Sequence, residues 1–359
     1  MIRADAVLIA MLRQAVIPLI LVLAGFFFVN CLIHPTLSRP IGLYAEGRSE
    51  KLVVLDRYVS RTNVAIFGTS HLQNGFDPRA FDARLAADGN HAQSLNLAIA
   101  GGSQTEQRAM ALEFLRKAAE SPTAPKRRLI LLEINAGANF RVQHLVHPRA
   151  INIYDVASVK LVAALSDSGV GRERQAGRIG YALLASCFHY ANLGMLANLV
   201  FQPALNAELL QSISGEDRRG LEALEPSSNS SAVIDNIFAQ RPVSAQDHVE
   251  SISAGNRDLV DQVYAAAGGD SVRVAYVVTP LLSGLATAPL YPSEVVTDRF
   301  RAPIINMARI NDDPELFSKD LWHDTAHLNA RGAALFSQVL AAKLAARINL
   351  DWLDAPEKP

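Results

Sequence analysis

Three short apolar segments in the first half of the chain alternate with two helical segments, and this alternation is the strongest constraint on the fold. Residues 63–67, 94–99 and 129–134 have the composition of buried strands, and residues 78–87 and 105–119 have the periodicity of amphipathic helices. Strands that are separated by helices form a parallel sheet covered by those helices. We therefore expect an α/β fold.

The same pattern returns near the C-terminus. A helix is predicted over 261–267, a buried strand over 272–278 and a long helix over 330–347. Asn329 is a suitable N-cap for the long helix because its side-chain oxygen can accept from the first free N–H groups. These elements extend the same α/β pattern.

An apolar run near the N-terminus predicts a membrane anchor. Residues 15–33 read AVIPLILVLAGFFFVNCLI, where only Asn30 is strongly polar, and this length crosses the hydrocarbon core as a helix. The alternative is a cleaved signal peptide, but the run is long and no small-x-small cleavage site follows it. Arg3 and Arg13 precede the run, which favours an N-terminus inside and a large domain outside. In a bacterium this places a single-pass protein in the inner membrane, with its domain in the periplasm.

The domain organisation follows from these elements. We expect an anchor over 1–35, one α/β domain over 36–350 and a tail over 351–359. Residues 141–260 do not alternate and look mostly helical, so they are interpreted as an insertion. Residues 179–201 are apolar enough to suggest a second membrane helix, but three polar residues within them favour a helix packed over the site.

The composition excludes several classes of protein. The chain has 359 residues, a net charge of -1 and no basic stripe with aromatic residues, so nothing indicates nucleic-acid binding. Its two cysteines, Cys31 and Cys187, are too few for a disulfide framework or a zinc site. We expect neither a metal nor an organic cofactor.

Two short motifs near opposite ends of the chain carry the candidate chemistry. Ser70 follows the first predicted strand, and ligand sites gather at the carboxyl ends of parallel strands. Asp324 and His327 are three residues apart, which allows the carboxylate to fold back under the imidazole. A serine hydroxyl needs such a base, and the base needs a partner that holds its tautomer. The three residues therefore predict a catalytic triad.

The surroundings of the serine narrow the possibilities. The segment Gly68-Thr69-Ser70-His71-Leu72 lacks the second glycine of a nucleophile elbow, which argues against an α/β-hydrolase. His71 and His323 compete with His327 as the base. His323 directly precedes Asp324 and suits a folded-back pair less well, and the side chain of His71 is expected to point away from Ser70.

Three blocks together resemble the SGNH hydrolase superfamily, which is also called GDSL-like. Gly68-Thr69-Ser70 matches its serine block, and the segment from Asn96 to Gly101 matches its second block. Asp324-Thr325-Ala326-His327 matches its last block. The resemblance implies a flavodoxin-like three-layer α/β/α fold, with the N–H groups of Ser70 and Gly101 in the oxyanion hole.

The third block departs from the family pattern. The family has Gly-x-Asn-Asp after its third strand, where the asparagine is an oxyanion donor. Here Glu133 replaces the glycine, so the equivalent donor is Asn135 or the displaced Asn139, or is absent. The loss of one such donor costs about 10²–10³ in rate.

The anchor and the insertion make the chain similar to a membrane-anchored branch of this superfamily. That branch includes proteins of alginate and cellulose O-acetylation and the D-alanyl transfer protein of teichoic acid. The resemblance implies an O-acetyltransferase acting on an exopolysaccharide or cell-envelope glycan, with a membrane-bound O-acyltransferase as partner. The alternatives are an esterase of the same chemistry and a non-catalytic protein that binds glycans or scaffolds an acylation complex.

Overall fold

The chain forms two compact units in the computed structural model of residues 1–359. One unit comprises Met1–Ala45, Arg141–Lys160 and Arg172–Ala204, and the other comprises Glu46–Phe140, Leu161–Gly171 and Leu205–Pro359. The structure describes residues 16–33, 47–134, 153–164, 172–192, 205–227, 231–240, 246–268, 271–282 and 287–353.

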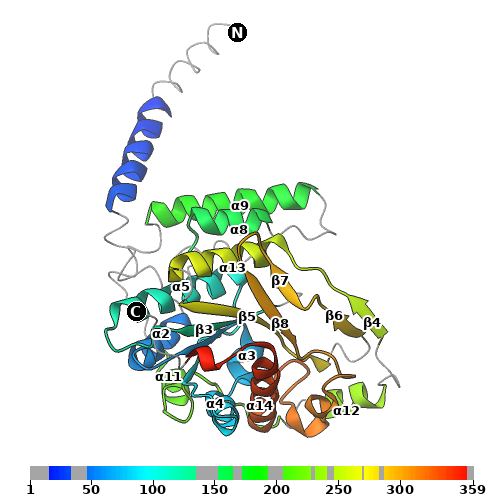
Figure 1. The fold of residues 1–359 in the computed structure, drawn as a ribbon. Helices are drawn as coiled ribbons and strands as arrows, with labels where there is room; N and C mark the ends of the chain where they lie inside the picture. The colour runs from blue at the N-terminus through cyan, green and yellow to red at the C-terminus, as the bar shows by residue number, and fades with distance from the viewer. Residues whose placement is uncertain are drawn as a thin grey trace. The chain divides into compact units, whose positions relative to one another are not determined.

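A six-stranded sheet forms the centre of the larger unit (Figure 1). Its order is β2-β1-β3-β5-β8-β7, and all neighbours are parallel except β7 and β8. The strands are β1 (Val64–Phe67), β2 (Ser94–Asn96), β3 (Arg128–Glu133), β5 (Val272–Val278), β7 (Glu294–Val296) and β8 (Arg301–Asn306). Counted along the chain, the five parallel strands have the order 2-1-3-4-5 of doubly wound sheets. The predicted α/β class is confirmed.

Helices cover both faces of this sheet (Figure 1). One face carries α4 (Pro78–Ala87) and α14 (Ala330–Arg347), and the other carries α5 (Gln104–Glu120) and α13 (Ala254–Ala267). Successive strand residues point to opposite faces, so β1 supplies both layers. The smaller elements are α2 (Arg48–Tyr58), α3 (Ser70–Gly75), α11 (Ala207–Ile213), α12 (Ser231–Ala239), 3-10 turns at Pro314–Phe317, Lys319–Leu321 and Asp351–Leu353, and a parallel pair of β4 (Gln246–Val249) and β6 (Thr287–Leu290).

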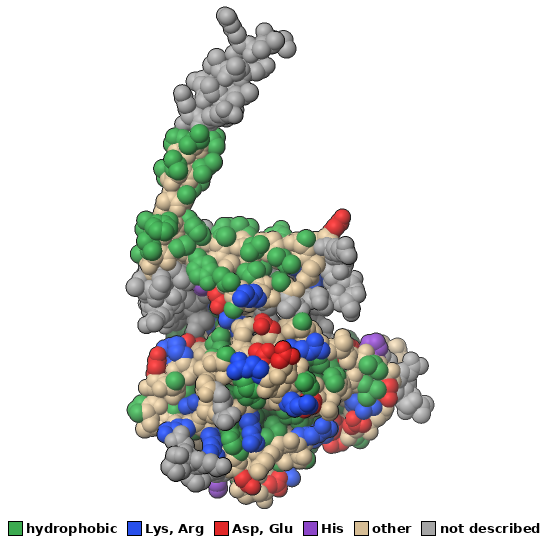
Figure 2. Space-filling view, turned by 45° about the horizontal axis from the view of Figure 1, so that its top comes forward, with side chains coloured by type: hydrophobic (Ala, Val, Ile, Leu, Met, Phe, Trp, Pro, Cys, Tyr) green, Lys and Arg blue, Asp and Glu red, His purple; other side chains and the backbone are tan. Residues whose placement is uncertain are grey.

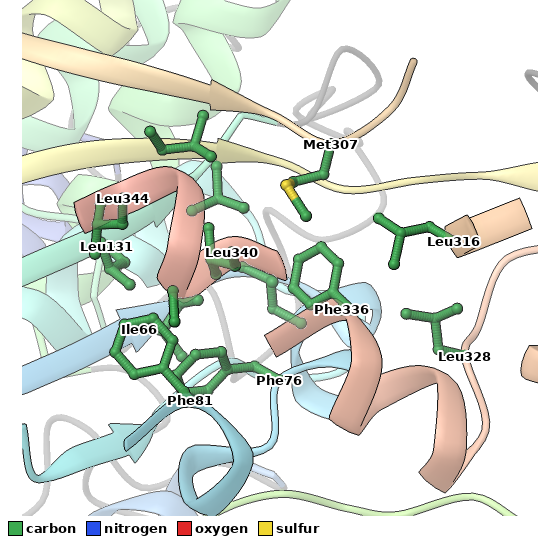
Figure 3. Close-up of a cluster of buried hydrophobic side chains, with 14 of the residues drawn as sticks. Ile66, Phe76, Phe81, Leu131, Met307, Leu316, Leu328, Phe336, Leu340 and Leu344 are labelled. Atoms are coloured by element: carbon green, nitrogen blue, oxygen red, sulfur yellow. The ribbon is translucent and has the colours of Figure 1, made fainter. Parts of the chain in front are cut away.

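The layer between the sheet and α4 and α14 holds a continuous apolar core (Figure 3). Ile66 of β1, Phe81 of α4 and Phe336 of α14 all belong to this cluster, and their side chains are buried. Burial of one such side chain contributes about 1.5–3 kcal/mol. The core thus fixes the helix that follows the Asp324 motif against the strand that precedes Ser70.

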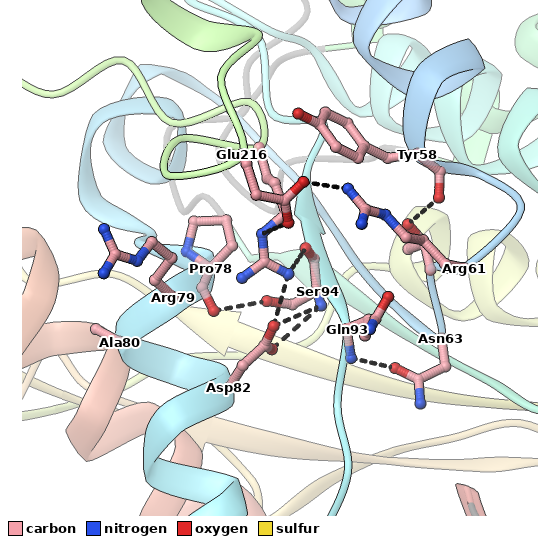
Figure 4. A network of polar contacts seen from close by, with 12 residues as sticks. Tyr58, Arg61, Asn63, Pro78, Arg79, Ala80, Asp82, Gln93, Ser94 and Glu216 are labelled. Atoms are coloured by element: carbon pink, nitrogen blue, oxygen red, sulfur yellow. Dashed lines mark hydrogen bonds and ion pairs between the residues drawn. The ribbon is translucent and has the colours of Figure 1, made fainter.

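A polar network fixes Ser94 at the amino end of β2 (Figure 4). Ser70 follows the carboxyl end of the neighbouring strand β1, so the network lies at the other end of the parallel strands. The carboxylate of Asp82 accepts from the N–H of Ser94 at 3.1 Å and from Nη1 of Arg219 at 2.7 Å. Burial raises the pKa of Asp82, and the charge of Arg219 lowers it by less. The Ser94 hydroxyl donates to the carbonyl of Pro78, which joins α4 to the strand.

The smaller unit is helical in its described residues. Its N-terminal helix is long and apolar enough over Val16–Ile33 to cross a membrane. It also contains α9 (Arg172–Tyr190) and the first part of α8 (Val156–Ala164). The predicted anchor is confirmed to this extent.

Most predicted elements agree with the structure. The helices over 78–87 and 330–347 and the strand over 272–278 have the predicted bounds. The strand predicted over 94–99 ends at Asn96, and the helix predicted over 261–267 begins at Ala254.

Candidate active site

Ser70 lies at the carboxyl end of β1, at the first residue of α3. Strand β1 is flanked by β2 on one side and β3 on the other, so the crossover from β1 to β2 and the crossover from β2 to β3 run in opposite directions across the sheet. This is the topological switch point, where doubly wound sheets place their ligand sites. Thr69 is the N-cap of α3 and accepts from the N–H of His71, which fixes the turn that presents the serine.

A tight loop presents Asp324 and His327. The N–H groups of Ala326 and His327 each donate to Oδ1 of Asp324 at 2.8 Å, so the carboxylate closes the loop on itself. Asn329 then caps α14 by accepting from the N–H groups of Arg331 and Gly332. The motif and the helix that follows it form one continuous piece of local structure.

The two motifs meet in a hydrogen-bonded relay. Nε2 of His327 lies 2.9 Å from Oγ of Ser70, and Nδ1 of His327 lies 2.8 Å from Oδ2 of Asp324. A carboxylate can only accept, so Nδ1 carries the proton and Nε2 is free to accept the proton of Ser70. Ser70 and His327 are 257 positions apart in the sequence. Together with Asp324 they nevertheless adopt the geometry of a nucleophile, a base and an orienting acid.

The electrostatics of the loop keep Asp324 ionised. Partial burial raises the pKa of Asp324, but the hydrogen bonds from the His327 side chain and from the N–H groups of Ala326 and His327 together lower it by more. The pKa of Asp324 therefore lies below its usual value of 3.8. At neutral pH the carboxylate can stabilise an imidazolium formed at His327.

Glu133, which stands where the resemblance to the SGNH superfamily leads us to expect a glycine, lies directly behind the serine turn. It is the last residue of β3, and its side chain is fully buried. A Cβ on Gly68 would lie 2.4 Å from Oε2 of Glu133 and 2.7 Å from Cδ1 of Leu72. Gly68 is therefore required because the backbone passes so close to Glu133.

Four donors converge on the Glu133 carboxylate. The N–H of Thr69 donates to Oε2, and the hydroxyls of Thr69 and Thr279 donate to Oε1 at 3.1 and 3.2 Å. Nδ1 of His71 lies 3.1 Å from the same oxygen. A buried carboxylate is costly unless it is satisfied in this way. Glu133 is thus part of the support of the serine turn.

The structure shows where the two rival histidines lie. The ring of His71 lies 5.7 Å from that of His327, centroid to centroid, and its Nδ1 is engaged by Glu133 and Thr69. Nδ1 of His323 instead contacts the backbone carbonyl of Glu225. His327 is the histidine whose ring nitrogen lies within hydrogen-bond distance of Oγ of Ser70 among the described residues.

Asn96, the first residue of the motif that ends at Gly101, has a clear structural role. The side chain of Asn96 is fully buried, donates to the carbonyls of Leu72 and Phe76 and accepts from the N–H of Ala98. It therefore ties the end of α3, which begins with Ser70, to the end of β2.

The glycines after β2 lie beside the serine turn. A Cβ on Gly102 would lie 2.7 Å from the carbonyl oxygen of Gly68. Gly101 is exposed and has a φ of +63°, which favours glycine. The loop that contains the predicted oxyanion donor Gly101 thus adjoins the backbone that leads to Ser70.

The remaining site predictions concern other donors and metals. Asn135 and Asn139 lie outside the described residues. Within the described part of the chain, no group of three or more His, Cys, Asp or Glu side chains could hold a metal ion.

The comparisons with known proteins add no family assignment: no protein-family model matches the chain, and no curated protein matches it. The function is therefore inferred from the geometry and the chemistry of the site.

The bond between Glu133 and His71 is not predicted by the sequence, where Glu133 is only a departure from a motif. A signal was present, since an acidic residue that ends an otherwise apolar strand has to find buried donors. The identity of those donors depends on how β1, β3 and β5 lie side by side, which no local pattern encodes.

Proposed function

We propose that the protein is an extracytoplasmic serine-dependent acyl-ester enzyme, and that it is an SGNH-like O-acyltransferase acting on a glycan. The observation that carries the proposal is the relay of Ser70, His327 and Asp324, with 2.9 and 2.8 Å between the bonded atoms. The 2-1-3-4-5 strand order and the position of Ser70 after β1 are what the resemblance to that superfamily predicts.

The first half of the reaction forms an acyl-enzyme. Oγ of Ser70 attacks the carbonyl carbon of an acyl donor while Nε2 of His327 takes the hydroxyl proton. The tetrahedral intermediate collapses as His327 returns this proton to the leaving group. The products are an ester on Ser70 and the free donor group.

The second half transfers the acyl group. A sugar hydroxyl gives its proton to Nε2 of His327 and attacks the ester carbonyl, and Ser70 leaves with that proton. Asp324 holds the imidazole in the same tautomer in both halves. The N–H groups of Ser70 and Gly101, with Asn135 or Asn139, are proposed to hold the oxyanion.

An esterase is the second candidate, and the exposure of the relay favours it. The side chains of His327 and Asp324 are 25% and 34% exposed, so water has access to the base. Hydrolysis and transfer share the acyl-enzyme and differ only in the acceptor. The resemblance to membrane-anchored acylation proteins favours transfer over hydrolysis.

The proposed location follows from the apolar helix. We propose that Val16–Ile33 anchors the protein in a bacterial inner membrane with the sheet domain outside the cytoplasm. A polysaccharide acceptor and a membrane-bound O-acyltransferase are the proposed partners.

The proposal is tested with the full chain in detergent micelles. Wild type and Ser70→Ala are incubated with a chromogenic acetyl ester and, separately, with a fluorophosphonate. Wild type should release the chromophore and become labelled, and Ser70→Ala should do neither. Release that rises when an oligosaccharide is added, with acetylated sugar found by mass spectrometry, would support transfer.

Two results would contradict the proposal. Wild type that neither turns over nor labels would favour a non-catalytic glycan-binding or scaffolding role. Turnover that survives in Ser70→Ala would place the chemistry elsewhere in the chain.

A further inference from the structure

Helix α9 exposes its apolar side chains. Tyr181, Leu183 and Leu184 are 42%, 51% and 43% exposed, and Cys187 is also exposed. With Ala176, Gly177 and Gly180 they form one face of the helix, and this face has no charged side chain from Ala176 onward. Figure 2 shows hydrophobic side chains gathered over the region of α8 and α9.

The buried side chains on the opposite face of α9 are small or polar. Ala182, Ala185, Ser186 and His189 are the buried residues of this helix. A helix on the surface of a soluble domain has the reverse arrangement, with its apolar stripe inward and its polar residues in water. The pattern of α9 therefore indicates that something other than water covers its outer face.

The structure connects the end of α9 with the end of the apolar N-terminal helix. Nδ2 of Asn192 donates to the backbone carbonyl of Asn30 at 2.9 Å and lies 3.4 Å from its Oδ1. Both asparagines are buried, and Asn30 is in the last turn of the Val16–Ile33 helix. If that helix crosses a bilayer, its last turn lies at the level of the lipid headgroups, and so does the end of α9.

The composition of α9 fits a helix lying on a bilayer. Its first two turns contain Arg172, Arg174 and Arg178 against Glu173, so its amino end is basic. Basic residues next to an apolar face are typical of interfacial helices on anionic lipid. The same arginines make it unsuitable for crossing the membrane, and among the described residues only the N-terminal helix meets the criteria for a span.

We propose that α9 lies along the outer surface of the bilayer that holds the N-terminal helix, with Tyr181, Leu183, Leu184 and Cys187 in contact with lipid. The smaller unit then holds the membrane at two places, a spanning helix and a surface helix. This inference rests on the proposed anchor but not on the acyl chemistry.

The test uses the full chain in nanodiscs that contain anionic lipid and one copy of the protein each. In the Cys31→Ser variant, Cys187 is the single thiol and is labelled with a nitroxide. Collision of the label with oxygen, which concentrates in lipid, is compared with collision with a water-soluble nickel chelate. We expect oxygen to reach the label at Cys187 severalfold better than the chelate.

Two control positions use the chain without its native thiols, Cys31→Ser and Cys187→Ser. A label at Leu23→Cys, in the middle of the N-terminal helix, reports whether that helix is inserted. A label at Arg116→Cys, an exposed position on α5, reports the value for water.

The outcomes are distinct. A chelate-accessible label at Cys187 with a lipid-embedded label at Leu23→Cys would overturn the surface helix and leave the anchor intact. Protection of Cys187 from both reagents would overturn it in favour of a protein contact. A chelate-accessible label at Leu23→Cys would overturn both the anchor and this inference.

Discussion

Asp324 and Glu133 are both carboxylates bonded to an imidazole beside Ser70, but their surroundings differ. The Asp324 side chain is 34% exposed and lies in a loop, and Glu133 is fully buried at the end of a strand. Asp324 is bonded to the histidine that reaches the Ser70 hydroxyl. Glu133 is bonded to the turn that carries Ser70.

The two carboxylates therefore suit two different tasks, proton transfer and support of the backbone. The accessible pair has the geometry for proton transfer, because its second imidazole nitrogen is free for the serine. The buried pair fixes the backbone, because a carboxylate that accepts from several donors is hard to move without leaving one of them unpaired. Substitutions at the two pairs should therefore differ in how they divide between turnover and stability.

The largest effect is expected for Ser70→Ala. Without the proposed nucleophile, turnover of an acetyl ester should fall by about 10⁴- to 10⁶-fold. The melting temperature should change little because the side chain is partly exposed. Thermal unfolding of the same samples is the control. If Ser70→Ala is inactive because it unfolds, the contrast between the Asp324–His327 pair and the Glu133–His71 pair loses its support.

Asp324→Asn should cost nearly as much. An amide can donate to Nδ1 and so select the wrong tautomer of His327, and this change costs about 10⁴ in turnover in a related relay. Steady-state kinetics measures the loss. The control is Asp320→Asn, at an exposed acid in the preceding turn that should have no effect on turnover.

Gly68→Ala tests the close approach to Glu133. The added Cβ would lie 2.4 Å from Oε2 of Glu133, so the turn has to shift. We expect a loss of about 1–3 kcal/mol in the free energy of unfolding and about 10²-fold in turnover from misplacement of Ser70. Gly89→Ala is the control for a glycine with no atom within 4 Å of its added Cβ, although its own φ of +84° costs some stability. Equal turnover in wild type and Gly68→Ala would contradict the account of the turn.

Glu133→Gln should have a smaller effect on turnover. The carboxamide keeps the shape but has only one acceptor oxygen for the donors around it, so we expect a loss of about 1–3 kcal/mol in the free energy of unfolding. Turnover should fall by about tenfold, less than for Asp324→Asn, with fluorophosphonate labelling of Ser70 retained. Thr279→Val, which removes one donor, is the matched control and should do less. A loss as large as that of Asp324→Asn would assign Glu133 a part in the chemistry itself.

The smallest effect on turnover is expected for Lys51→Met, which should instead change how the free energy of unfolding depends on pH. Lys51 is buried on α2, where its Nζ donates to the carbonyls of Asn96 and Gly220. Burial lowers the pKa of Lys51 from 10.5 to about 7, and the charge of Glu222 raises it by less. Between these values the unfolded chain binds more protons than the folded protein, so the free energy of unfolding should rise with pH from about 7 to about 10.

Denaturant titrations at several pH values measure this contribution. Lys51→Met should lose that part of the rise, and Lys319→Met, at an exposed lysine, should keep it. An unchanged pH dependence in Lys51→Met would show that burial of this lysine has no such effect.

The sequence predicted the elements whose patterns are local. The helix over 330–347 has a long apolar stripe and a cap at Asn329, and the strand over 272–278 is a continuous apolar run, so both can be recognised from their own residues. Strand β8 was not predicted because Pro303 interrupts its sequence, and it forms where β5 and β7 provide partners.

Part of the candidate site could likewise be predicted from local patterns, and part of it could not. The order and spacing of the motifs with Ser70, Asp324 and His327 allowed the relay to be predicted, because each motif follows or precedes a regular element. The bond between Glu133 and His71 could not be predicted, since it depends on the parallel register of β1 and β3. The exposed apolar face of α9 was also missed, because an apolar helix in the sequence does not reveal which side is buried.

The most direct test of the central claim is to trap the acyl-enzyme. The full chain is mixed with an activated acetyl ester, quenched in acid after a short interval and digested, and the peptide that contains Ser70 is examined by mass spectrometry. The account predicts that this peptide gains one acetyl group, that the group is on Ser70, and that His327→Ala slows its appearance. Absence of acetylated peptide in a wild-type sample that consumes the ester, or acetylation at another residue with Ser70 unmodified, would contradict it.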